Sequence, residues 1–123
     1  MAHQKLTPDQ IRRIEEIEEF QHAAHHLKRL VTELEANRAG QTRTIQQLTE
    51  KISNEASQMR QRALTANVGT IADVAGTMSV MASRGGGINM KIRVLGDAVS
   101  SLFMQLDVAM KHATTPLEPK KPA

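Results

Sequence analysis

The chain has 123 residues, a formal net charge of +3 and no cysteine, tryptophan or tyrosine. The lack of cysteine excludes disulfides and thiolate metal sites, and the scarcity of aromatic residues argues against a strand-rich domain. The mild basic excess permits an anionic partner without requiring one. The N-terminal segment lacks the apolar core of a signal peptide, so a cytoplasmic location is expected.

The first helix is expected to follow Thr7, which suits the N-cap position. Pro8 then takes the first helical position, Gln10 is placed for a capping box, and Gly40 marks the end. Residues 1–6 are expected to be flexible. Two apolar series repeat every seven residues, as in a coiled-coil seam. They are Ile17, Ala24 and Val31, and Phe20, Leu27 and Leu34.

A second helix is expected from about residue 42 to residue 83. Apolar positions recur every eleven residues at Leu48, Met59, Thr70 and Met81, a repeat that keeps one stripe along a nearly straight helix. Asn67 and Gly69 weaken its middle. A break near 65–70, which would give four helices instead of three, is therefore the alternative.

The last helix has the most regular pattern. Its apolar residues follow alternating spacings of four and three: Ile88, Ile92, Leu95, Val99, Leu102, Leu106 and Ala109. Met90 and Val94 widen this face, which indicates more than one neighbouring helix. The helix is expected to end near residue 113, before a disordered proline- and lysine-rich tail at 114–123. The fold class is all-α: over 7–113, an antiparallel bundle or hairpin of three long helices, or four if the second breaks, with coiled-coil-like packing.

The three glycines at 85–87 separate two helical patterns. With Arg84 beside them, their backbone amides are a candidate anion site at a helix N-terminus. No preceding strand or nucleotide-binding spacing supports that interpretation. A tight reversal, in which glycine supplies a positive φ, is the favoured one.

Histidines on the first helix are a candidate metal site. Glu18, His22 and His26 recur at intervals of four, and such a spacing can hold a divalent ion. A second matching pair of ligands is not found in the sequence, and His22 and His26 fall outside the apolar seam. An exposed polar face is favoured, and no metal or cofactor is predicted.

Basic residues supply a candidate nucleic-acid surface. If the helices bring them together, they would follow a phosphate backbone, although stacking aromatic residues are nearly absent. They are Arg60, Arg62, Arg84, Lys91 and Arg93.

Small residues in the second helical region allow close helix contact. Residues 63–83 are long enough to cross a bilayer, but Asp73, Asn67 and several hydroxyl side chains argue against insertion. Attachment to a membrane surface stays open as a third alternative, beside nucleic-acid and metal binding.

The function favoured by these patterns is a non-enzymatic structural or adaptor subunit. Its apolar stripes exceed what a thin hairpin can cover, so it is expected to self-associate or to bind a permanent protein partner. Methionines gather in the second half of the chain, where a partner is expected to dock. The predicted interface comprises Ala72, Gly76, Ser79, Ile92, Leu95, Val99, Leu102 and Leu106. The alternative is a helical nucleic-acid-binding subunit of a larger complex.

Overall fold

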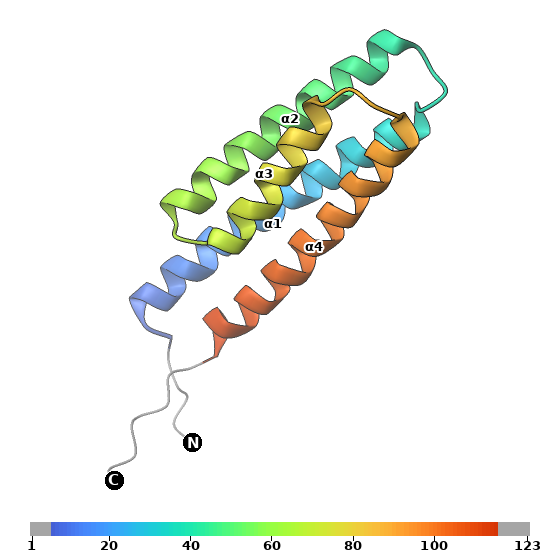
Figure 1. Ribbon diagram of the computed structural model, residues 1–123. Helices are drawn as coiled ribbons and strands as arrows, with labels where there is room; N and C mark the ends of the chain where they lie inside the picture. Colours follow the sequence, from blue (N-terminus) through green and yellow to red (C-terminus); the bar gives the residue numbers. More distant parts are fainter. Residues whose placement is uncertain (1–5, 116–123) are drawn as a thin grey trace, which may run out of the picture.

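The computed structural model describes residues 6–115 as an antiparallel bundle of four helices (Figure 1). These are α1 (Pro8–Ala36), α2 (Thr42–Thr65), α3 (Gly69–Ser83) and α4 (Ile88–Thr114). Each helix packs against the next along the chain, and α4 closes the ring against α1. The all-α class is confirmed, in its four-helix form. The predicted flexible N-terminus and disordered tail lie almost wholly outside the described residues.

The start of α1 is fixed by the predicted capping box. The Thr7 hydroxyl accepts a hydrogen bond from the Gln10 amide at 3.1 Å, and the Gln10 side-chain oxygen accepts one from the Thr7 amide at 2.9 Å. Two amides that a helix leaves unpaired are thereby satisfied. Gln10 also donates to the Thr115 carbonyl at 2.8 Å, which ties the start of α1 to the end of α4.

The core follows the predicted seams closely. All six seam residues of α1 are buried, as are four of the predicted α4 residues, Leu95, Val99, Leu102 and Leu106. Leu30 of α1 is buried as well, because α1 has two neighbouring helices, α2 and α4. Burial of each such aliphatic side chain contributes about 1.5–3 kcal/mol.

The predicted second helix is interrupted between α2 and α3. Asn67 takes a left-handed backbone conformation with φ of 61°. The Val68 amide donates to the Ala63 carbonyl at 2.7 Å and the Asn67 amide donates to the Leu64 carbonyl at 3.2 Å. This pair of bonds is the Schellman arrangement, with asparagine in place of the usual glycine. The break allows α3 to fold back along α2.

One predicted core position is wrong for this reason. The eleven-residue repeat, continued through the whole segment, predicts that Thr70 lies on the buried stripe, but Thr70 is exposed. The turn at Asn67 resets the phase of the helix, so Ile71 and Ala72 face the core instead.

The glycine corner joins α3 to α4. All three glycines lie in open space, and only Gly86 has a positive φ, of +139°, which L side chains rarely adopt. The favoured interpretation of a tight reversal agrees with this geometry. With 15 residues, α3 is much shorter than α2, which has 24. At about 1.5 Å per residue, α3 is about 22 Å long and α2 about 36 Å. The first turns of α2 are therefore not covered by α3.

Candidate functional site

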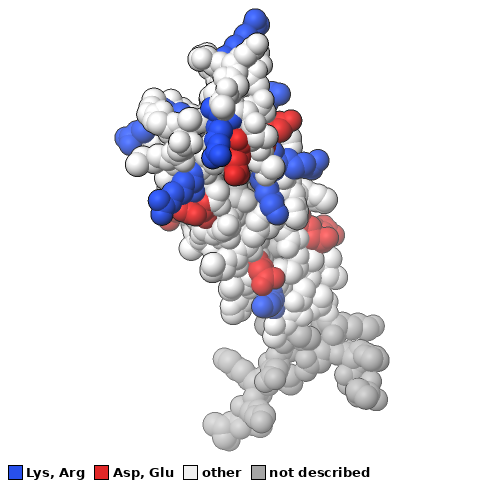
Figure 2. All heavy atoms as spheres, turned by 90° about the vertical axis from the view of Figure 1, so that its right-hand side faces the viewer, with Lys and Arg blue, Asp and Glu red and all other residues white. Residues whose placement is uncertain are grey.

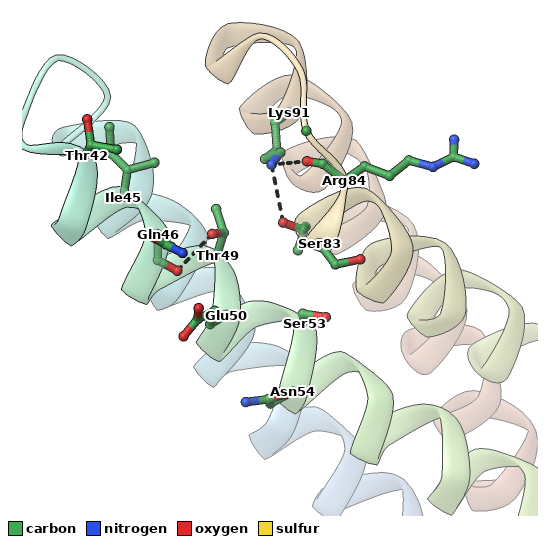
Figure 3. A pocket seen from close by; sticks show the side chains of 12 residues that line it. Thr42, Ile45, Gln46, Thr49, Glu50, Ser53, Asn54, Ser83, Arg84 and Lys91 are labelled. Carbon is green, nitrogen blue, oxygen red and sulfur yellow. Dashed lines mark hydrogen bonds between the residues drawn. The ribbon is translucent and has the colours of Figure 1, made fainter.

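A cleft of about 550 Å³ opens where α3 ends short of the first turns of α2 (Figure 3). We call it the end cleft. Its α2 wall presents hydroxyl and amide groups together with the Glu50 carboxylate, and its opposite wall is the glycine corner. It is lined by Thr42, Ile45, Gln46, Thr49, Glu50, Ser53, Asn54, Ala82, Ser83, Arg84, Gly85 and Lys91.

Lys91 crosses from α4 to the end of α3 inside this cleft. Its ammonium group donates to the backbone carbonyls of Ala82, at 3.3 Å, and Arg84 (Figure 3). The last carbonyls of a helix have no partner within the helix and carry partial negative charge. Lys91, predicted as a nucleic-acid contact, therefore serves to cap α3.

A second groove lies between α2 and α3, and we call it the arginine groove. Arg60 and Arg84, both predicted as nucleic-acid contacts, line it together with Ser57, Thr77 and other residues of α3. Its volume is about 590 Å³. Arg62, in the last turn of α2, and Arg93, on α4, are exposed but do not line this groove.

The predicted small-residue face of α3 packs against α2 of the same chain. Ala72 is buried. The Arg60 side chain covers Gly76, with its Cδ 3.1 Å from the position that a Cβ would take. The Ser53 hydroxyl donates to the Ser79 carbonyl at 3.1 Å. The close approach that small residues allow is thus used within the bundle.

The predicted interface residues of α4 also face inward. Leu95, Val99, Leu102 and Leu106 are buried in the core, and Ile92 is half-buried. Because the chain turns after α2, α3 packs against α2 and α4 of the same chain and buries its own apolar side chains there. Self-association remains a prediction. Its physical basis now rests on the side chains that the four helices leave outside.

The histidines of α1 lie on its exposed face. His26 Nε2 is 3.7 Å from a carboxylate oxygen of Glu55 on α2. The rings of His25 and Phe103 are 4.7 Å apart between centroids. Within residues 6–115, no three His, Asp or Glu side chains gather as a metal site would require.

The outer face of α4 carries a second stripe, which includes Met90 and Val94. The sequence pattern predicts that these two residues widen the buried face, but they lie on the outer one. Met90, Met104 and Val108 are 68%, 67% and 49% exposed, and the half-buried Val94 lies on the same face. The signal was present as a second series with spacings of four and three, offset from the buried one. We call it the outer α4 stripe: Met90, Val94, Asp97, Ser101, Met104 and Val108.

None of the helices within residues 6–115 combines the length and the apolar character needed to cross a bilayer. Comparisons with known proteins add no further information: no protein family, no curated protein and no solved structure matches this chain.

Proposed function

We propose that this protein is a non-enzymatic structural subunit that works by packing the outer α4 stripe against another polypeptide. One observation carries the proposal: Met90 and Met104 are about two-thirds exposed, Val108 is 49% exposed, and the three lie in line along a single helix. Isolated exposed apolar residues are common on protein surfaces, but an aligned series on one helix face has the form of a helix-packing seam.

The residue types of the stripe also support docking. Methionine is enriched at protein interfaces because its unbranched, polarisable side chain adapts to irregular partners. Polar Asp97 and Ser101 occupy the centre of the stripe. A polar centre between apolar ends favours one register over others, since each shifted register would bury an unpaired polar group.

Two measurements on the full chain test this proposal. Sedimentation velocity over a concentration series should show association that is lost in Met104→Glu and kept in Gln58→Glu, a control on the exposed face of α2. In cells that naturally produce the chain, a photo-crosslinking residue at position 104 should yield a covalent protein adduct. A monomer at every concentration, together with no adduct at 104, would overturn the proposal.

Nucleic-acid binding is a second candidate function, because Arg60 and Arg84 line the same groove as several hydroxyl side chains. Phosphate contacts of this kind weaken as salt rises. Fluorescence anisotropy with short duplex and single-stranded probes should then show salt-dependent binding that Arg60→Glu reduces and Arg62→Glu leaves nearly unchanged. Binding that ignores salt, or no binding at low salt, removes this candidate.

A further inference from the structure

The outer α4 stripe has the same chemistry when read from either end. Met90 and Val94 form one apolar end, Met104 and Val108 form the other, and Asp97 and Ser101 lie between them. A stripe with this symmetry is self-complementary across a twofold axis, as an interface between identical copies requires. We infer that its occupant is a second copy of this chain, with the two α4 helices antiparallel. This inference rests on the proposed function.

The antiparallel alignment pairs unlike positions of the stripe. Met90 of one copy faces Val108 of the second, Val94 faces Met104, and Asp97 faces Ser101. All apolar residues then meet apolar residues. A parallel, in-register pair would instead place Asp97 against Asp97, and two like charges on a shared seam repel.

The centre of the stripe also offers a hydrogen bond across the axis. Within the chain, the Ser101 hydroxyl accepts a hydrogen bond from the Gln105 side-chain nitrogen at 3.0 Å. A serine hydroxyl has one donor hydrogen in addition to its acceptor sites. That hydrogen is directed to the Asp97 carboxylate of the second copy, and the twofold axis repeats the bond.

Charges beside the stripe select the same orientation. Arg93 precedes Val94 and Asp107 precedes Val108, so both hold equivalent flanking positions on one edge of the stripe. In an antiparallel pair of helices, residues on this edge of one helix face residues on the same edge of the other. Arg93 of each copy then lies opposite Asp107 of the other, and the axis produces two such pairs.

The surroundings of the stripe leave room for these contacts. Arg93 and Asp107 are both exposed. The Asp107 carboxylate is 3.3 Å from the Lys111 ammonium group and its side chain remains 68% exposed, so a further cation can reach it. Figure 2 faces the side of the bundle that carries α4 and shows basic and acidic side chains interspersed, without a field of one sign that would repel a second copy.

Charge exchange tests the pairing. Arg93→Asp alone and Asp107→Arg alone each place like charges opposite one another, so each should raise the dimer dissociation constant about tenfold. An equimolar mixture of the two variants should form a heterodimer, and both changes within one chain should restore the homodimer. Arg43→Asp, an exposed change near the start of α2, is the control and should leave the dimer intact.

Cross-linking tests the orientation. Because the chain has no cysteine, Ser100→Cys and Met90→Cys each introduce a single thiol. Ser100 lies beside the axis of the antiparallel pair, so a short bismaleimide should link two copies of Ser100→Cys. The two sites in Met90→Cys would be about 27 Å apart along the antiparallel pair and should not link. In a parallel pair Met90→Cys would link instead, and that result would overturn the inference.

The outcomes separate this inference from the proposed function. The antiparallel α4 pair is refuted if the chain dimerises but neither charge variant weakens the dimer, or if Ser100→Cys does not cross-link. Either result leaves the subunit proposal standing. If the chain is a monomer and position 104 crosslinks to a different protein, the antiparallel pair is likewise refuted and the subunit proposal stands. Circular dichroism of each variant should match that of the unchanged chain, because all the substituted positions are exposed.

Discussion

The ammonium group of Lys91 lies 3.3 Å from the carbonyl oxygen of Ala82 and joins the start of α4 to the end of α3. The same group donates to the Arg84 carbonyl. Arg84 is the C-cap of α3, and its own side chain extends away from these bonds (Figure 3). Lys91 therefore links the two helices on either side of the three-glycine turn through side-chain hydrogen bonds.

Replacing Lys91 with methionine should lower the free energy of unfolding by about 1 kcal/mol, because the α3 carbonyls lose a charged donor. Denaturant unfolding followed by circular dichroism measures the change. Lys51→Met, on the exposed face of α2, should alter the stability by much less. Equal losses in the two variants would show that Lys91 does not stabilise the corner.

Arg13 makes the corresponding contact at the other end of the bundle. Its guanidinium group donates to the Ala66 carbonyl at 3.0 Å, at the C-cap of α2. Arg13→Met should cost about 1 kcal/mol of unfolding free energy, whereas Arg12→Met, one position along on an exposed face, should be nearly neutral. A cost for Arg12→Met as large as that for Arg13→Met would contradict the assignment.

The conformation of Gly86 predicts a position-specific cost within the three glycines. An alanine at position 86 would be held at φ of +139°, so Gly86→Ala should lower the unfolding free energy by about 1–3 kcal/mol. At position 85 an added Cβ would meet nothing within 4 Å, and the backbone there does not have a positive φ. Gly85→Ala should therefore leave the unfolding free energy unchanged or raise it slightly. Thermal unfolding of the two variants side by side decides this, and a reversed order would refute it.

Asn67 should respond to substitution in the manner of a left-handed helix cap. Asn67→Ala should lower the unfolding free energy by about 1 kcal/mol, because alanine at φ of 61° lacks the short polar side chain that lets asparagine adopt the left-handed conformation. Asn67→Gly should keep or slightly raise it, because glycine adopts this conformation without strain. Chemical denaturation measures both. Alanine that proves as stable as glycine would mean that the α2–α3 turn relaxes to another conformation.

Much of the fold could be predicted from the sequence, because the interactions that determine it are local or follow the helical repeat. The capping box of Thr7 and Gln10 depends on residues three positions apart. The seams of α1 and α4 depend on helical spacing alone, so Leu27 and Leu102 were placed in the core correctly. The same reasoning failed at Thr70, because the left-handed residue Asn67 ends α2 and the eleven-residue repeat does not carry over into the first turn of α3.

The candidate site was harder to predict from the sequence, because residue spacing along one helix does not show which of its faces packs against a neighbouring helix. By itself, the sequence determined that the chain is helical, where α1, α2 and α4 begin and which residues repeat, since these properties follow from local hydrogen bonding and helical periodicity. Only the tertiary structure decided that α3 folds back on α2, that Leu95 and Leu106 face this chain's own core, and that Met90 and Met104 remain outside. Burial depends on contacts between distant segments, and those exist only once the helices have packed.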